Sequence, residues 1–401
     1  MTRLATLLSA LLLGAFPAAA QDVKISGGVV RIGVLSDRSG PYSGVTGEGS
    51  AVAARLAAEE FGNKVLGRPV EILVGDHQNK ADLGAVTARR WFDTEDVDMI
   101  ADAANSAVGF AILGLVKERG KVLLHNAASA DFTGKACAAT AVQWNVNTFA
   151  NAKVLAQAGM AQGYDTWFTI APDFAFGRAL AADLRRFVEA GGGKVVGEVF
   201  NPLGAPDFSS FLLQAQGSGA KVIAMGNVGS DFVNSVKQAN EFGLTRRQTL
   251  ATFTINLTDM EPIGLETAGG FLAVSTFEWD RNDASRTWTK RFSDRTGTLP
   301  SAAQAATYSA VRHYLRAVEA AGTDEGPTVV AKMRELPVRD AFAENGRVRE
   351  DGQFVHDLFL VRAKKPADSK GRGDYFDIVQ TVSGDEAFQS LADSACPLVK
   401  K

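Results

Sequence analysis

The sequence has few of the residues on which enzymatic and metal sites commonly depend. Its 401 residues include four histidines and two cysteines. The histidines are scattered, and none belongs to an HExxH or similar metal-ligand spacing. A GxSxG elbow, a P-loop and a CxxC pair are also missing. These absences predict a protein that is not an enzyme and holds no metal or cofactor, although two carboxylates brought together by folding could still support acid–base catalysis.

A complete dinucleotide-binding fingerprint is also lacking. Gly47-Glu48-Gly49 follows the first predicted strand, but the third glycine of GxGxxG is absent. The loop at residues 36–46 is too long for the tight strand-to-helix turn that this fingerprint requires. The glycines therefore favour ordinary turn formation over a nucleotide site.

The sequence lacks runs of basic residues and has no second long apolar segment. Its formal net charge is -3, and 22% of its residues are charged. A mildly acidic chain of this kind gives no support to nucleic-acid or anionic-membrane binding. The most apolar internal segment, residues 107–116, is followed directly by Lys117-Glu118-Arg119, which favours a buried or amphipathic helix. We expect no nucleic-acid partner and no direct insertion into a membrane.

Residues 1–20 have the pattern of a secretory signal peptide. Arg3 is their only charge, an apolar run covers residues 4–16, and three alanines precede Gln21. The apolar run is shorter than the roughly 20 residues that span a bilayer, and no cysteine at the cleavage point would accept a lipid. The pattern predicts cleavage after Ala20 and a soluble exported protein. A retained N-terminal anchor is the alternative.

The two cysteines, Cys137 and Cys396, are predicted to form a disulfide. In an oxidising compartment a pair of cysteines is more often bridged than free. Such a bond would tie the tail at residues 396–401 back to the first third of the chain. The alternative is two separate thiols.

Short apolar strands alternate with helical patterns along most of the chain. One series begins with VVRIGVL at residues 29–35, and a second begins with WFTIA at residues 167–171. This alternation favours an α/β fold with doubly wound parallel sheets. Two units of about 120 residues each predict two similar lobes. Because no Gly-, Ser- or Pro-rich linker separates them, short connections that could act as a hinge are expected.

Small polar and aromatic residues follow the predicted strands, at the sheet edge where open parallel sheets bind ligands. In the first half these candidates are Tyr42, Asn105, Ser106, Ala127 and Ser129. Asn or Ser at a helix start can leave backbone N–H groups free for a carboxylate, or can simply cap the helix. In the second half the candidates are Asp173, Phe174, Phe176, Asn227, Phe253 and Thr254. The aromatic residues among them would form pocket walls or belong to the core.

Five stretches together resemble the periplasmic solute-binding proteins of branched-chain amino-acid (Leu/Ile/Val-binding-like) ABC importers. They are RIGVLSDRSGPYSG, LGRPVEILVGDHQNKADLGAVTARRW, AANSAVG, HNAASADFTG and DFAFGRAL. The resemblance implies the type I periplasmic binding fold, in which two Rossmann-like lobes joined by three crossover strands close on a ligand. It places lobe 1 at residues 28–147 plus 277–350 and lobe 2 at residues 148–276 plus 351–395. It also implies a monomer whose partners are importer transmembrane subunits.

The family pattern assigns roles to several candidates. The turns that grip the ligand carboxylate fall on Asn105-Ser106 and on Ala127 with Ser129, and two aromatic positions fall on Phe176 and Asn227. Amino-acid-binding members hold the ligand ammonium with an acidic residue near the position of Phe253 and Thr254, where this chain has none.

We therefore predict a small carboxylate ligand with an apolar remainder, an aromatic acid being favoured. Two alternatives stay open. One is a branched-chain or other amino-acid or amide ligand, since Asp173 could serve an amine. The other is a sensory ligand-binding module of the same fold.

Overall fold

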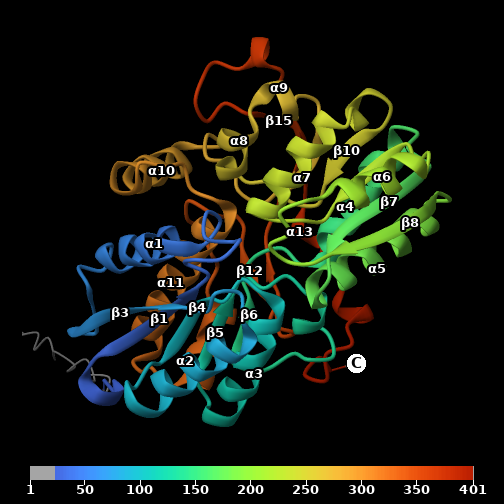
Figure 1. Cartoon of the computed structure of the whole chain (residues 1–401). Helices are drawn as coiled ribbons and strands as arrows, with labels where there is room; N and C mark the ends of the chain where they lie inside the picture. The colour runs from blue at the N-terminus through green and yellow to red at the C-terminus, as the bar shows by residue number, and fades with distance from the viewer. Residues whose placement is uncertain (1–22, 401) are drawn as a thin grey trace, which may run out of the picture.

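The computed structural model describes residues 23–400, so the predicted signal peptide and its cleavage site lie outside the described residues. The chain folds into two α/β lobes, one mainly blue and cyan and the other mainly green and yellow in Figure 1. Each lobe has a central sheet with helices on both faces, which explains why the central strands are apolar on both sides.

The first lobe is built on a six-stranded sheet in the order β2-β3-β1-β4-β5-β6. All neighbouring pairs are parallel except β2 with β3. The strands are β1 (Val30–Ser36), β2 (Lys64–Val65), β3 (Arg68–Asp76), β4 (Met99–Asp102), β5 (Val122–His125) and β6 (Ala141–Gln143). A separate two-stranded sheet pairs β12 (Arg347–Val348) with β13 (Phe354–Val355).

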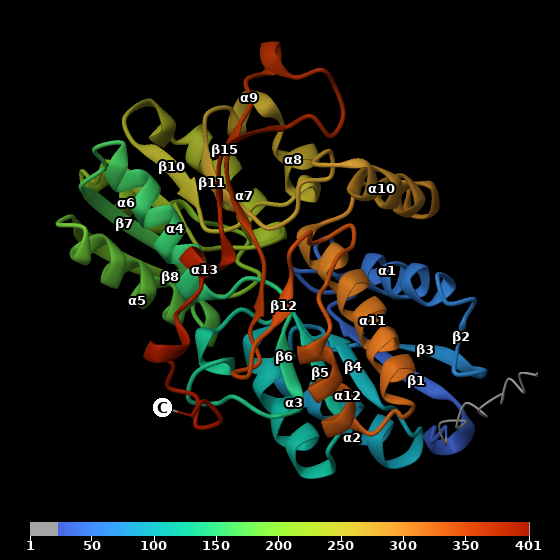
Figure 2. The same ribbon diagram turned by 180° about the vertical axis from the view of Figure 1, so that it is seen from behind.

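Helices from both ends of the chain cover this first sheet. One face packs against α1 (Gly47–Glu59), α10 (Asp283–Thr296), α11 (Ala302–Ala321) and α12 (Gly326–Glu335). The other face packs against α2 (Ala81–Thr94) and α3 (Ser106–Arg119). Figure 2 shows α11 and α12, in orange, beside the blue and cyan strands. A late segment of the chain therefore completes the first lobe.

The second lobe is built on a seven-stranded sheet in the order β15-β14-β11-β10-β9-β7-β8. The antiparallel pairs are β11 with β14 and β14 with β15, and all other neighbouring pairs are parallel. The strands are β7 (Thr166–Pro172), β8 (Lys194–Asn201), β9 (Val222–Met225), β10 (Thr249–Thr252), β11 (Leu272–Ser275), β14 (Leu358–Ala363) and β15 (Phe376–Val382).

The helices of the second lobe cover both faces of its sheet. One face packs against α4 (Thr148–Ala161), α5 (Ala175–Ala190) and α13 (Gly384–Ala387). The other face packs against α6 (Ser209–Gly217), α7 (Ser230–Glu241), α8 (Leu257–Ile263) and α9 (Leu265–Ala268). Five short 3₁₀ turns complete the elements: η1 (Ser26–Gly28), η2 (Ala130–Phe132), η3 (Leu244–Arg246), η4 (Pro366–Asp368) and η5 (Leu391–Asp393).

The two sheets have the same winding. Numbered along the chain, the five parallel strands of each lobe follow the order 2-1-3-4-5: β3-β1-β4-β5-β6 in the first and β8-β7-β9-β10-β11 in the second. The predicted fold class, two Rossmann-like lobes with parallel sheets, is confirmed. In both lobes the carboxyl ends of the first and third strands adjoin, which is the topological switch point where such sheets bind ligands.

Three segments join the sheets of the two lobes, at residues 144–147, 276–282 and 356–357, and the tail after α13 returns once more to the first lobe. Buried hydrogen bonds connect the residues in and beside these crossovers. Thr276 Oγ1 donates to Asn145 Oδ1 at 2.9 Å, and Asn147 Nδ2 donates to Gln353 Oε1 at 2.8 Å. The crossovers thus form one bonded bundle at the back of the cleft, suited to a hinge.

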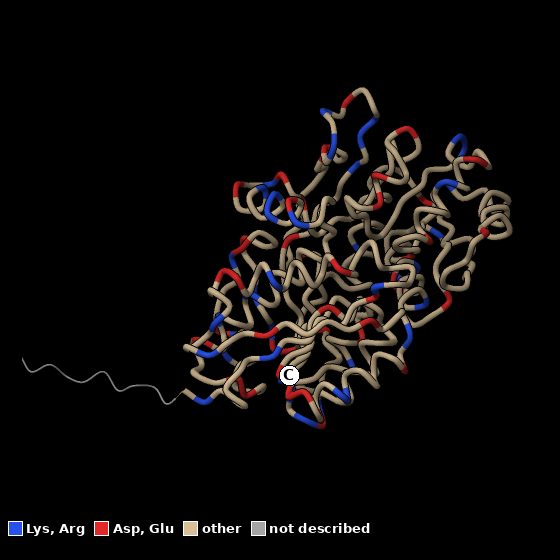
Figure 3. Tube along the Cα trace, turned by 60° about the vertical axis from the view of Figure 1, so that its left-hand side comes forward, with Lys and Arg blue, Asp and Glu red and all other residues tan. Residues whose placement is uncertain are grey.

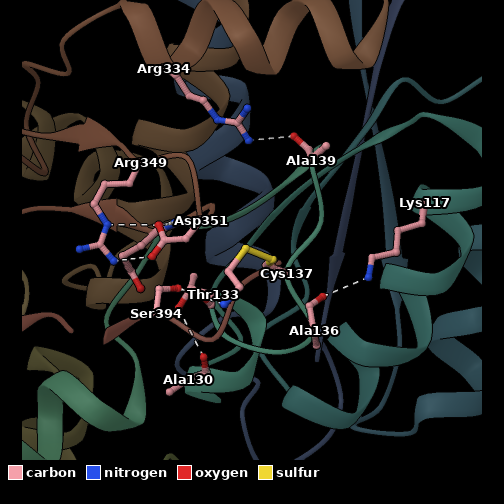
Figure 4. Close-up of a disulfide and its surroundings, with 12 residues drawn as sticks. Lys117, Ala130, Thr133, Ala136, Cys137, Ala139, Arg334, Arg349, Asp351 and Ser394 are labelled. Carbon is pink, nitrogen blue, oxygen red and sulfur yellow. Dashed lines mark hydrogen bonds and ion pairs between the residues drawn. A yellow bond between two sulfur atoms is a disulfide. The ribbon is translucent and has the colours of Figure 1, made fainter. Parts of the chain in front are cut away.

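The predicted disulfide between Cys137 and Cys396 is present (Figure 4). Both cysteines are buried, and they lie 259 residues apart in the sequence. Beside the bond, Ser394 Oγ donates to Thr133 O at 3.5 Å. The disulfide holds the tail that follows β15 against the first lobe.

Acidic and basic side chains are interspersed along the trace, as Figure 3 shows. Many are paired, as in the two bonds of 2.6 and 2.8 Å between Arg295 and Glu59. None of the helices within residues 23–400 combines the length and apolar character that crossing a membrane would require.

Candidate functional site

A cavity lies between the lobes, beyond the carboxyl ends of both parallel sheets. About 640 Å³ of space free of atoms lies within it, the open mouth included. The first lobe and the crossover at residues 144–147 contribute Tyr42, Val45, Thr46, Ala104, Asn126, Ala128, Asn145, Val146, Ala302 and Ala303. The second lobe contributes Asn151, Phe174, Phe176, Val228, Thr254 and Asn256.

The cavity wall contains no charged side chain among residues 23–400; its polar groups are amides and hydroxyls. Two buried carboxylates lie directly behind wall amides. Asp102 accepts from Asn126 Nδ2 at 2.9 Å, and Asp259 accepts from Asn256 Nδ2 at 3.1 Å. Burial raises the pKa of Asp102 to about 7 and that of Asp259 to about 6. The groups that can contact a ligand directly are therefore neutral, and the two carboxylates lie behind them.

A tight turn after β1 places Tyr42 on the wall. Asp37 organises it by accepting the N–H groups of Gly40 at 2.7 Å and Tyr42 at 2.8 Å. The Tyr42 hydroxyl is buried and has no hydrogen-bond partner in the described part of the chain. Burial, together with the nearby Asp231 and Asp37, raises the pKa of Tyr42 well above its usual value. The phenol therefore stays protonated and keeps its capacity to donate a hydrogen bond.

The segment after β5 lines the wall with alternate residues. Asn126 and Ala128 lie on the wall, whereas Ala127 and Ser129 do not. Ala127 is completely buried, and the Ser129 N–H donates to Ser106 Oγ at 3.2 Å. Successive residues of an extended chain face opposite sides. The residues that line the cavity are therefore the neighbours of the predicted pair, and Ala127 and Ser129 themselves face away from it.

The predicted anion turn at Asn105 and Ser106 also lies beside the wall rather than on it. Asn105 Oδ1 caps α3 by accepting the N–H groups of Ala107 at 2.8 Å and Val108 at 3.2 Å. This is the capping arrangement that the sequence left open as the alternative.

The open helix N-terminus at the cavity belongs to α5 in the second lobe. Its N-cap residue is Phe174, which makes no side-chain capping bond, and its first turn has no acidic residue. Phe174 and Phe176, both predicted, line the wall beside this terminus. Uncapped N–H groups and the helix dipole make such a terminus favourable for an anion.

The remaining predicted residues differ in their positions. Thr254 lies on the wall, and Phe253 is buried in the second-lobe core. Asn227 is buried next to the wall residue Val228, and neither atom of its amide has a hydrogen-bond partner within residues 23–400. Asp173 points to solvent, with half of its side chain exposed, and pairs with Arg178 at 2.7 Å. The binding roles of these residues stay predictions.

The structure adds wall residues that the sequence did not single out: Val45, Thr46, Ala104, Asn126, Ala128, Asn145, Val146, Asn151, Val228, Asn256, Ala302 and Ala303. Asn256 carried a local signal, since Asn-x-x-Asp at residues 256–259 is a capping-box pattern. Asn145 and Asn151 carried none, because they reach the cavity only through the crossover and the start of α4.

Comparison with known proteins places the chain among solute receptors. The profile of the periplasmic binding protein family matches residues 29–372. A periplasmic binding protein from Burkholderia mallei is 40% identical, with 93% of this chain and 99% of that chain covered and a TM-score of 0.91.

Two further solved structures are similar. A branched chain amino acid ABC transporter periplasmic ligand-binding protein from Burkholderia xenovorans LB400 is 40% identical over 92% of this chain and 100% of that chain, with a TM-score of 0.83. An ABC transporter solute-binding protein from R. palustris, solved with benzoate, shares the fold at 16% identity, with 88% and 96% covered and a TM-score of 0.80. No curated protein sequence matches the chain.

Proposed function

The chain belongs to the periplasmic binding protein family of ABC transporters, and from this premise we propose that it captures a small, preferably aromatic carboxylate for import. In this proposal residues 1–20 direct export to the periplasm and the mature protein acts as a monomer. Lobe 1 (residues 28–147 plus 277–350) and lobe 2 (residues 148–276 plus 351–395) close on the ligand and then dock on importer transmembrane subunits. No catalytic step is involved.

The observation that carries the proposal is a wall without charged side chains among residues 23–400, beside the N-terminus of α5, which has neither a side-chain cap nor an acidic residue in its first turn. An α-amino acid would bring an ammonium group into a cavity whose wall has no carboxylate among the described residues. Leaving such a charge unpaired costs about 3–5 kcal/mol in buried sites. A carboxylate instead meets the first turn of α5, where the helix dipole supplies roughly half a positive charge.

The aromatic preference rests on the rings at this end of the cavity. The Phe174 and Phe176 rings have centroids 5.9 Å apart, and Tyr42 reaches the same cavity from the first lobe. Aromatic surfaces favour an aromatic ligand through offset or edge contacts. The R. palustris protein solved with benzoate indicates that the fold is compatible with such a ligand.

We expect the two lobes to close on a ligand, because each lobe contributes part of the cavity wall. Direct bonds also cross the cleft: Ala302 N–H donates to Asn256 Oδ1 at 3.2 Å, and Ser230 N–H donates to the Pro41 carbonyl at 3.1 Å. A ligand that touches both halves binds the closed form better than the open form, and that difference in affinity shifts the balance.

A branched-chain amino acid is the second candidate, favoured by the description of the Burkholderia xenovorans relative. Its ammonium would have to bind neutral acceptors such as the amide oxygens of Asn126 and Asn151, which have no hydrogen-bond partner within residues 23–400.

A calorimetric and thermal-shift screen of the mature protein tests the proposal, with benzoate, cinnamate, leucine and isoleucine as ligands. We expect an aromatic acid to raise the unfolding temperature and to make the protein more compact in small-angle scattering. Stabilisation by leucine or isoleucine without any aromatic acid would overturn the aromatic preference. Co-purification with a receptor instead of importer subunits would favour the sensory role.

A further inference from the structure

The loop between α10 and α11, residues 297–301, is anchored to the first lobe at both ends. Before the loop, α10 packs against α1 of the first lobe. At its end, Ser301 Oγ donates to the Val45 carbonyl. One turn into α11, Gln304 Nε2 donates to the Thr46 carbonyl at 3.0 Å. Because all these partners belong to the first lobe, the loop has to move with that lobe.

Leu299, in the middle of this loop, is nevertheless buried in the second lobe. Only 9% of the residue is exposed, and the other buried members of its hydrophobic cluster all belong to the second lobe. Among them are Leu257 and Met260 of α8 and Ile255 just before that helix. A leucine carried by one lobe is therefore packed into the core of the other.

Asn256 of the second lobe makes a hydrogen bond to the residue that follows the loop. Its Oδ1 accepts the N–H of Ala302, the first residue of α11, at 3.2 Å. Asp259 Oδ2 accepts both the backbone N–H of Asn256 at 2.9 Å and its Nδ2 at 3.1 Å. Backbone N–H groups can only donate, so the amide of Asn256 has the same orientation whether Asp259 is ionised or protonated. The second lobe thus presents an oriented acceptor to the first.

A second polar contact reaches the start of the loop. Arg372, from the turn between β14 and β15, donates from Nη2 to the Gly297 carbonyl at 3.0 Å and from Nε to Glu261 Oε1 at 2.6 Å. Gly297 ends α10, where the helix dipole favours a positive charge. The Arg372 side chain is 55% exposed, so we expect this contact to contribute less than the burial of Leu299.

We propose that residues 297–302 form a latch that docks on α8 only when the lobes close, and that Leu299 is its main stabilising side chain. An apolar contact made in the closed form alone shifts the open–closed balance toward closure. It therefore raises the apparent affinity for every ligand that needs the closed form. Leu299 does not line the cavity, so it acts without touching the ligand. The inference rests on the proposed capture of a ligand between closing lobes.

The competing interpretation is a permanent contact, in which Leu299 stays in the second-lobe core while the lobes open. The two interpretations differ in the ligand-free protein. A latch leaves Leu299 in water there, whereas a permanent contact keeps it buried. Measurements without ligand can therefore separate them.

The first experiment compares the rates at which N-ethylmaleimide alkylates Leu299→Cys and Thr298→Cys in the ligand-free mature protein. Both native cysteines are held in the disulfide, so the new thiol is the reactive one. Thr298 is exposed in the closed structure and serves as the matched control. We expect the two rates to agree within about tenfold, because the open form exposes both positions. A larger difference, with position 299 the slower, overturns the latch.

The second experiment measures thermal unfolding without ligand and calorimetric affinity for the tightest binder among benzoate, cinnamate, leucine and isoleucine. Leu299→Ala should leave the unfolding temperature unchanged within about 1 °C and weaken binding at least about tenfold. The matched control is Leu212→Ala, which removes a leucine of α6 from the same cluster. It should show the reverse, an unfolding temperature lower by at least about 3 °C and normal affinity.

The outcomes separate this inference from the proposed function. Equal losses of unfolding temperature in Leu299→Ala and Leu212→Ala overturn the latch and leave ligand capture intact. An unchanged affinity of Leu299→Ala also overturns it. If none of the four compounds binds, the proposed function fails, and the alkylation rates and unfolding temperatures still decide between a latch and a permanent contact.

Discussion

The carbonyl of Pro41 accepts a hydrogen bond of 3.1 Å from the N–H of Ser230, across the cleft between the lobes. Pro41 belongs to the turn after β1, and Ser230 is the first residue of α7. Gly229 directly precedes Ser230 and has φ of 63°. A Cβ at Gly229 would lie 2.3 Å from the carbonyl oxygen of Pro41. Only glycine allows both this backbone conformation and this close approach.

Gly229→Ala should therefore hinder closure. The added methyl group would push the Pro41 turn away, so the two lobes could not meet fully around a ligand. We expect ligand affinity to fall at least about tenfold, and the ligand-induced compaction seen by small-angle scattering to shrink. The free energy of unfolding should fall as well, because φ of 63° with ψ of -136° lies outside the left-handed helical region and is nearly restricted to glycine.

Gly219→Ala is the matched control for this variant. Gly219 lies in the same lobe and has φ of 65°, but a Cβ there would have no atom within 4 Å. It should lose some stability, because its positive φ disfavours alanine, and it should keep normal ligand affinity. Equal affinities for the two variants would contradict a role of the Pro41 contact in closure.

Thr254→Asp should change the preferred ligand class. Thr254 lies on the wall, where amino-acid-binding relatives are expected to carry an acid. A carboxylate there would repel an aromatic acid and offer a partner to an ammonium group. We expect calorimetry to show at least a tenfold loss for the best aromatic acid and a gain for leucine. Thr245→Asp, on the exposed surface of the same lobe, should change neither affinity.

Removing the disulfide should destabilise the fold. The bond between Cys137 and Cys396 closes a loop of 259 residues, so it restricts the unfolded chain strongly. Chemical denaturation of the Cys137→Ala/Cys396→Ala variant should show a free energy of unfolding lower by about 2–5 kcal/mol. The wild type under reducing conditions should match the variant. Equal stability of the oxidised wild type and the variant would show that the disulfide contributes nothing to the stability of the fold.

His313→Gln should weaken the loss of stability in acid. Burial lowers the pKa of His313 to about 4, and its Nε2 lies 2.9 Å from the Met333 carbonyl. Between the ordinary pKa of about 6.5 and this lowered value, the unfolded chain binds a proton that the folded chain does not, so stability falls as the pH falls. Glutamine can still donate to Met333 but does not titrate.

Denaturation curves at pH 7 and pH 4.5 measure this effect. Between these values the wild type should lose about 2–3 kcal/mol more free energy of unfolding than His313→Gln. An identical loss in both proteins would show that His313 contributes nothing to the pH dependence. The comparison of the two proteins cancels the contributions of the other buried acids and histidines.

Local patterns were sufficient to predict the central elements of the fold. Helix α11 (Ala302–Ala321) is an example, because both of its end signals are local in the sequence. Ser301 and Gln304 form a capping box, and Gly322 ends the helix in a left-handed conformation. The strand expected at residues 29–35 is likewise β1 (Val30–Ser36). Helix α10 was not predicted, since its sequence is strongly polar and only one side of it packs against the first lobe.

The location of the candidate site was predictable from the sequence, but the identity of all the residues that line it was not. Strand ends located the binding edge, and Tyr42, Phe174, Phe176 and Thr254 do reach the wall. Which of two neighbouring residues faces the cavity depends on how the segment leaves its strand, so Asn126 replaces Ala127 there. Ala302 and Ala303 reach the same wall only because a late helix returns to the first lobe.

Local patterns and the count of two cysteines were enough to predict the alternation of strands and helices, the duplication of the lobe and the disulfide pair. Only folding showed that the cavity wall has no charged side chain among residues 23–400 and that α3 is capped by Asn105 whereas α5 has no side-chain cap. Folding also placed Asn126 on the wall. The Asn126 amide is held there by Asp102 and Thr307, which lie 24 and 181 residues away in the sequence, and no local pattern records which distant groups will share a buried hydrogen bond.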